Sequence, residues 1–249
     1  MSEHSKFILT PLSKVLDEAA CAVMRVTEGM EAIPLVDYIL HSVFLKMTGF
    51  QEQKFKCICW EIATKDYDFR YKWLEGQGNA KIGGCSTFED KNKVYQQVID
   101  HLYQPDATKF ADFDHEYSGI RTDIVKQTKK KIQCFYNNPI LKSTACLFNT
   151  YINIVKQVDA NFIIKNNGLF SQKQVCTLTL DQIYSDYLYR HRNRCAHNLM
   201  SYQANFQSFE NLHKENNKFD NYYLFYFMLI LIDEIITLTY RQLFEKEGW

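Results

Sequence analysis

Apolar residues recur at intervals of three and four along most of the chain, which is the spacing of amphipathic helices. Strand-like alternation of apolar and polar residues is harder to find. The pattern predicts helices over residues 12–28, 35–47, 51–74 (one long helix or two short ones), 87–103, 107–137 and 139–158, one that starts at residue 180, and one over 219–244. This periodicity predicts an all-α fold.

The breaks between these helices carry capping and turn signals. Gly29 and Gly49 follow apolar stripes and are predicted to end helices there. Ser86 with Glu89, and Thr179 with Gln182, fit the capping box that opens a helix. Two stretches are predicted to be loops, namely residues 76–84, which hold four of the nine glycines, and the polar residues 166–168. The glycine-rich loop lacks the G-K-[ST] of a phosphate loop.

The longest apolar run covers residues 222–232 and is followed at once by Asp233 and Glu234. Eleven residues are too few to span a bilayer, which needs about 20. We therefore expect a buried helix, in the core or partly against a second subunit, and no membrane role.

Residues 106–249 are predicted to form the principal helical domain. Residues 1–105 are either a regulatory helical region or part of the same domain.

The eight cysteines show no paired C-x-x-C spacing, and the N-terminus has no apolar signal segment. Reduced thiols in the cytoplasm are the simplest interpretation. Cys57 and Cys59 form a C-x-C, but a zinc site needs a second pair of ligands. The sequence thus predicts buried thiols at these positions and no metal site.

Positive charge is concentrated between residues 120 and 197, although the chain as a whole has a net charge of +0. This block holds twelve Lys or Arg against four Asp, which leaves an excess of eight positive charges. An anionic partner for this face is one interpretation, with phosphate as the obvious chemistry. The other is that lysines such as Lys129, Lys130 and Lys131 only cover a solvated helix face.

The helix that starts at residue 180 ends in the densest cluster of this block, "YLYRHRNRCAHN" (residues 187–198). Arg190, Arg192 and Arg194 gather at one helix end. The helix dipole explains one such cation, but three repel one another unless an anion offsets their charge. His191 continues the apolar stripe of the helix and is expected to be a satisfied core or interface residue.

Arg192 and His197 do not share a face of an ideal helix. They are five residues apart, which separates them by about 140° at 3.6 residues per turn. If both act at one place, either the helix ends between them or a second copy of the chain supplies one of the two.

The six residues "RNRCAH" (192–197) resemble the R-x(4-6)-H motif of the HEPN superfamily, with Asn193 at the place of its frequent asparagine. The resemblance extends over about residues 107–249. It implies a helical bundle of the HEPN type, a homodimer with a composite active site, and a metal-independent ribonuclease of a toxin or antiviral system. An antitoxin or another regulatory partner is a further implication. Leu199 stands where toxins regulated by a partner nucleotidyltransferase carry a tyrosine, so that regulation is not expected.

The chemistry of RNA cleavage suits these residue types. His197 can act as general acid or base, because imidazole titrates near neutral pH. Arg192 can bind the phosphate oxygens in a two-point fork, and Asn193 can orient His197 or the phosphate. Arg190, Arg194 and the three lysines at 129–131 are expected to bind RNA. The expected activity is metal-independent cleavage of single-stranded RNA by its own 2′-hydroxyl, without a cofactor. The alternative is a non-catalytic helical module that binds RNA or a nucleotide, or that only dimerises.

Overall fold

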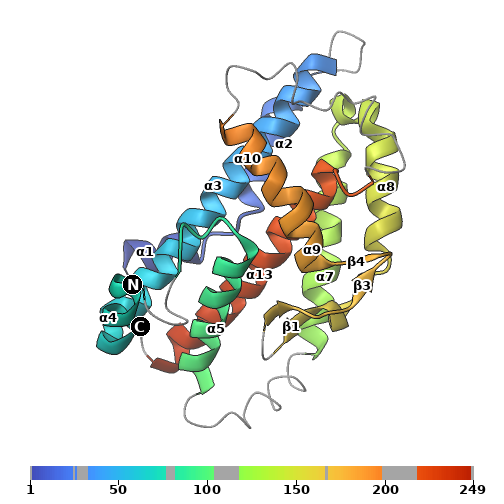
Figure 1. The fold of residues 1–249 in the computed structure, drawn as a ribbon. Helices are drawn as coiled ribbons and strands as arrows, with labels where there is room; N and C mark the ends of the chain where they lie inside the picture. The colour runs from blue at the N-terminus through green and yellow to red at the C-terminus, as the bar shows by residue number, and fades with distance from the viewer. Residues whose placement is uncertain are drawn as a thin grey trace.

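The computed structural model describes residues 2–24, 26, 33–76, 82–103, 118–165, 168–197 and 218–247. These residues are mostly helical (Figure 1), so the predicted all-α class is confirmed at this level. Before the basic cluster the helices are α1 (Glu3–Ile8), α2 (Lys14–Val23), α3 (Ile33–Lys65), α4 (Tyr67–Glu75), α5 (Phe88–Tyr103), α7 (Ser118–Tyr136), the 3-10 helix η3 (Pro139–Thr144), α8 (Ala145–Val155) and the short η4 (Ala160–Phe162). The remainder are α9 (Leu180–Ile183), the π-helical segment η5 (Tyr184–Tyr189), α10 (Arg190–His197) and α13 (Tyr222–Glu247).

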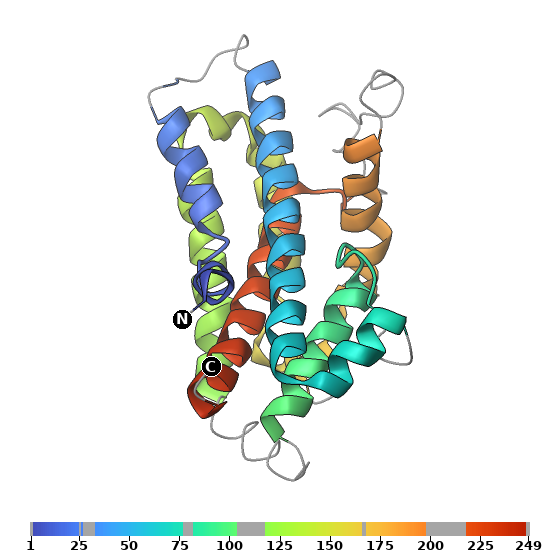
Figure 2. The ribbon, with the colours of Figure 1, turned by 90° about the vertical axis from the view of Figure 1, so that its left-hand side faces the viewer.

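Helix α13 is the central element of the fold. It packs against α3, α5, α7 and α8, which surround it in Figures 1 and 2. Every side chain from Tyr222 to Asp233 is buried, so the predicted buried helix is confirmed. The helix is long and apolar enough to cross a membrane, but 89% of its apolar window is buried inside the protein. Among the described residues it is therefore the core of the bundle.

Residues 1–105 contribute helices to the same hydrophobic core as α13. The Tyr226 hydroxyl donates a hydrogen bond to the Leu40 carbonyl at 2.6 Å, and the Gln51 amide donates to the Leu229 carbonyl at 2.7 Å. Both bonds join α3 to α13 within the buried layer. A regulatory role for this region stays a prediction, but its long helix is part of the packed bundle.

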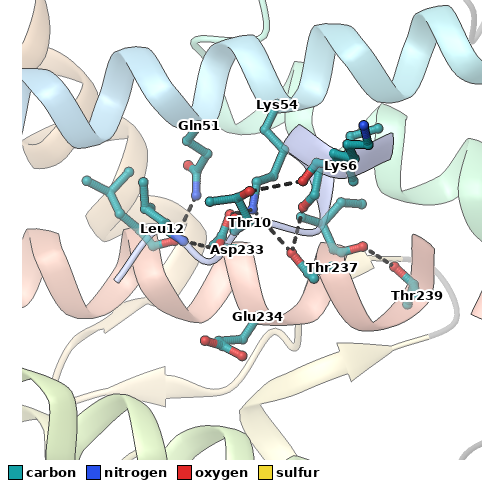
Figure 3. Close-up of polar contacts among 12 residues, drawn as sticks. Lys6, Thr10, Leu12, Gln51, Lys54, Asp233, Glu234, Thr237 and Thr239 are labelled. Atoms are coloured by element: carbon teal, nitrogen blue, oxygen red, sulfur yellow. Dashed lines mark hydrogen bonds and ion pairs between the residues drawn. The ribbon is translucent and has the colours of Figure 1, made fainter. Parts of the chain in front are cut away.

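A buried ion pair also joins α3 to α13 (Figure 3). The Lys54 ammonium lies 2.6 Å from Asp233 Oδ1, and the two side chains are 0% and 1% exposed. The turn between α1 and α2 closes over the pair, because Lys54 also donates to the Thr10 carbonyl and the Leu12 N–H donates to Asp233 Oδ2. Burial lowers the pKa of Lys54 and raises that of Asp233, and their mutual attraction opposes both shifts.

Two glycine predictions have different outcomes. Gly49 does not end a helix, because α3 continues through it to Lys65. The prediction was wrong since a glycine inside a helix costs only about 1 kcal/mol, and packing of both flanking segments on the core outweighs that cost. Gly76 ends α4 in the left-handed conformation, with φ of 64°, which supports the loop predicted from residue 76. Gly29 and residues 77–81 lie outside the described part of the chain.

The predicted capping boxes are correct at one helix and shifted by one residue at the other. Gln182 Oε1 accepts a hydrogen bond from the Thr179 N–H at 3.0 Å, and α9 starts at Leu180 as expected. At α5 the hydroxyl of Thr87, not of Ser86, accepts from the Asp90 N–H at 3.1 Å. Ser86 instead offers its carbonyl to the Tyr184 hydroxyl at 3.2 Å.

Four short strands occupy a segment for which the periodicity predicted only a polar loop. The first antiparallel hairpin pairs β1 (Ile163–Lys165) with β2 (Gly168–Phe170), and the second pairs β3 (Gln174–Val175) with β4 (Leu178–Thr179). Strands of two or three residues are too short to show an alternating pattern, which is why the sequence did not reveal them. Residues 166 and 167, the centre of the predicted loop, lie outside the described part.

The helix predicted over residues 107–137 is present as α7 from Ser118 to Tyr136, and residues 104–117 lie outside the described part. The α-helix predicted over residues 139–158 is shorter than expected. The second begins with a 3-10 turn at Pro139, and its α-helical part ends at Val155. The Asn221 amide, just before α13, donates to the Leu147 carbonyl of α8 at 2.8 Å. This bond helps to hold α8 against the start of α13.

Candidate functional site

The basic cluster lies at the end of one helical run formed by α9, η5 and α10, which follow one another from Leu180 to His197. Arg192 and His197 both belong to α10, so the helix does not end between them. Of the two alternatives, a helix break between them is excluded, and joint action of these residues at one place leaves a second copy of the chain as the other. The backbone of His197 closes α10, and its side chain lies outside the described part.

Arg192 is held by a carboxylate from a distant part of the sequence. Its Nε donates to Glu52 Oε1 at 3.1 Å and its Nη2 to Glu52 Oε2 at 3.0 Å. This two-point contact connects α10 to α3, and the side chains are 25% and 14% exposed. The Nη1 group donates to the neighbouring Asn193 Oδ1 at 3.2 Å. Arg192 thus has one edge fixed to the bundle and its Nη1 directed to the motif asparagine.

Arg194 points to the loop that leads into α13. Its Nη2 lies 3.6 Å from Asp220 Oδ1 and 3.4 Å from His191 Nδ1. Burial raises the pKa of Asp220, and the positive charge of Arg194 opposes that shift. The predicted RNA-binding residue Arg194 is thus partly engaged inside the protein, whereas Arg190 is exposed.

His191 lies in an aromatic pocket, which agrees with the prediction of a satisfied core residue. Its ring centroid is 5.1 Å from those of Phe44 and Tyr222, and its Nε2 is 3.1 Å from the Tyr222 hydroxyl. Burial lowers the pKa of His191 to about 3, and Arg194 and His41 add to the shift. At neutral pH the ring is uncharged and serves packing.

This buried histidine predicts an acid-sensitive fold. The unfolded state binds its proton below about pH 6.5 and the folded state only near pH 3, so the free energy of unfolding falls as pH drops across this window. The fall reaches up to about 1.4 kcal/mol per pH unit. His191→Gln keeps a polar partner for the Tyr222 hydroxyl and should flatten this dependence in urea titrations between pH 4 and 6.5. His4→Gln, at an exposed position, is the control. An equally steep fall in His191→Gln would contradict the assignment.

Lys129, Lys130 and Lys131 do not share one surface with the arginines of α10. Figure 2 shows α7, which carries residues 129–131, on one side of α3 and α13, and α10 on the other. Lys129 donates to the Val158 carbonyl at 2.8 Å, and Lys131 pairs with Glu234 at 2.5 Å. Lys130 is exposed. The interpretation of these lysines as a solvated helix face with local partners is thus better supported than a shared RNA site.

Two charged residues of this site escaped the sequence analysis. Glu52 lies 140 residues before Arg192, and nothing in its local pattern distinguishes it from the other acids of α3. Lys91 is 1% exposed, although its position near the start of α5 is compatible with an ordinary surface lysine. Both became visible only when the packing of α3, α5 and α10 was known.

The described residues hold no group of three or more His, Cys, Asp or Glu side chains that could bind a metal ion. Cys57 and Cys59 are buried free thiols, as predicted. Burial raises the pKa of the Cys57 thiol. In comparisons with known proteins, no family model, no curated protein and no solved structure matches the chain.

Proposed function

We propose that the protein is a metal-independent endoribonuclease of the HEPN type that cleaves single-stranded RNA. The observation that carries the proposal is the anchored arginine of the R-x(4-6)-H motif. Arg192 is held by Glu52 at 3.0–3.1 Å and contacts the motif asparagine, on the same helix whose last residue is His197. A cation that is half-buried and oriented is suited to bind the phosphate that undergoes cleavage.

The reaction uses groups that the RNA and the motif supply. The 2′-oxygen attacks phosphorus and loses its proton to a base, while the bond from phosphorus to the 5′-oxygen breaks and that oxygen receives a proton. The products are a 2′,3′-cyclic phosphate and a free 5′-hydroxyl. His197 serves as the base or the acid, and Arg192 stabilises the charge that develops on the phosphoryl oxygens. Two copies of His197 in a two-fold dimer supply both functions.

Cleavage of single-stranded RNA in the presence of EDTA tests this proposal. Arg192→Lys keeps the positive charge but loses the planar fork, so we expect cleavage to fall by about 10²- to 10³-fold. Products are resolved on denaturing gels, and the cyclic phosphate is identified by mass spectrometry. Arg241→Lys, at an exposed position of α13, is the matched control with near wild-type cleavage. No cleavage by the wild type, or full activity of Arg192→Lys, would refute the proposal.

The second candidate is a non-catalytic helical module that binds RNA. The contacts of Arg192 with Glu52 and of Arg194 with Asp220 favour it, because carboxylates that already offset these cations can serve structure alone. Salt-sensitive RNA binding without cleavage under any condition would support this candidate.

Expression of wild type and His197→Ala in a bacterial host, with growth and RNA integrity scored together, tests a toxin or antiviral function.

A further inference from the structure

Lys91 is a buried lysine at the meeting point of α3, α5 and η5. Its ammonium donates to the Cys85 carbonyl at 2.6 Å. Two aromatic rings flank it, with the nitrogen 5.1 Å from the ring centroid of Phe55 and 5.9 Å from that of Tyr184. A neutral carbonyl and two rings compensate only part of the cost of removing a charged amine from water.

The charges around Lys91 connect it to the candidate site. Burial lowers the pKa of Lys91 to about 8, and the negative charge of Glu52 is the strongest influence that raises it again. Arg192 lies near enough to lower it further. Glu52 of α3 therefore interacts with two cations, one on α5 and one on α10. At neutral pH these three side chains carry two positive charges and one negative charge.

This arrangement restricts the carboxylate of Glu52. Its two oxygens accept from Nε and Nη2 of Arg192, so the plane of the guanidinium follows the plane of the carboxylate.

We propose that Glu52 and Lys91 are positioning residues that hold Arg192 in the orientation in which it binds the scissile phosphate of RNA. The proposal rests on the proposed ribonuclease function and deepens it. Glu52 fixes one edge of the guanidinium. The charge of Lys91, whose ammonium lies against the ring of Phe55 one turn further along α3, attracts the carboxylate of Glu52. The Nη1 edge, next to Asn193, remains for the phosphate.

Kinetics of Glu52→Gln and Lys91→Met test the proposal. Glu52→Gln keeps the shape of the side chain but loses its charge, and we expect kcat to fall by about 10- to 100-fold, as for a misplaced catalytic group. Lys91→Met should lower kcat at least about 5-fold while the melting temperature is unchanged or higher, because a buried charge is removed. If Lys91 only supported the fold, kcat of Lys91→Met would fall only together with the melting temperature. Unchanged kcat in both variants would overturn the proposal.

The matched control is Glu18→Gln, which removes a carboxylate from an ion pair of similar length. Glu18 lies 2.7 Å from Lys46, and both side chains are at least half exposed. We expect kcat and KM of this variant to equal those of the wild type. A loss of kcat in Glu18→Gln as large as in Glu52→Gln would show that any lost carboxylate has this effect, and it would overturn the proposal.

Nuclear magnetic resonance of the Arg192 side chain separates this proposal from the proposed function. In the wild type, the Nε–H proton of Arg192 should exchange slowly with water, because it donates to Glu52. The exchange should accelerate at least 10-fold in Glu52→Gln and increase measurably in Lys91→Met. If the Nε–H proton of Arg192 exchanges slowly in a wild type that does not cleave RNA, the ribonuclease function is refuted, while Glu52 is still shown to hold Arg192. Rapid exchange in the wild type, or the same rate in all three proteins, would refute the positioning even if RNA is cleaved.

Discussion

Replacement of His197 by alanine is expected to lower the rate of RNA cleavage by about 10²- to 10⁴-fold, the usual contribution of a general acid or base. The substitution removes the imidazole at the last residue of α10, where a truncated side chain interrupts no helix. The fold and the oligomeric state should therefore persist. Initial rates are measured on a fluorogenic single-stranded RNA in EDTA, with circular dichroism and light scattering on the same samples.

His4→Ala is the matched control, because this histidine is exposed and lies on α1. It should cleave RNA at the wild-type rate. A mixture of His197→Ala with Arg192→Lys adds a test of the composite site. If each cleft uses both copies of His197, mixed dimers keep a single histidine and recover no activity, whereas a site that needs only one arginine and one histidine from different copies would recover part of it. Wild-type cleavage by His197→Ala alone would exclude a catalytic histidine at this position.

The second large effect is expected from the buried ion pair of Figure 3. Lys54→Met should lower the free energy of unfolding by about 3–5 kcal/mol, because Asp233 stays buried without its counter-charge. The cost also includes the hydrogen bond to Thr10 that fixes the turn between α1 and α2. Urea titrations monitored by circular dichroism measure the change.

The double variant Lys54→Met with Asp233→Leu distinguishes a lost charge pair from damaged packing. Replacement of both partners by apolar residues of similar volume should restore most of the stability. Lys91→Met, in contrast, should preserve or raise the free energy of unfolding. The Lys91 ammonium donates to the neutral Cys85 carbonyl, so its removal leaves no carboxylate buried without a counter-charge. A double variant as unstable as Lys54→Met would mean that packing, and not the unpaired carboxylate, causes the loss.

The sequence predicted elements whose signals are local. The stripe of α5, the capping residues of α9 and the apolar run of α13 each act within a few turns, and the structure has all three. Elements that depend on tertiary packing were missed or misjudged. The hairpins at residues 163–179 consist of strands of two and three residues, and the continuation of α3 through Gly49 depends on the core that both of its halves cover.

The candidate site was predictable only in its contiguous part. The spacing of residues 192–197 is visible in the sequence, whereas Glu52 reaches Arg192 from a helix 140 positions earlier along the chain. The basic block misled in one respect, because it grouped α7 and α10 by sequence although the bundle separates them. Charge counted along a chain does not report the face on which a helix places that charge.

The π-helical segment η5 has a consequence for how this chain tolerates insertions and deletions. Its bonds span five residues, so it holds more residues per turn than the α-helices on either side. Loss of one residue between Tyr184 and Tyr189, with a return to ordinary α-helical winding, would leave the downstream residues on nearly the same faces, because the wider turn absorbs one extra residue. Arg192 would then still face Glu52, with the motif "RNRCAH" intact. A residue lost from the α-helical turns of α10 before Arg192 would instead rotate this arginine away from Glu52 by about 100°. In related chains, a change of length is therefore expected in the π-helical segment and not in α10.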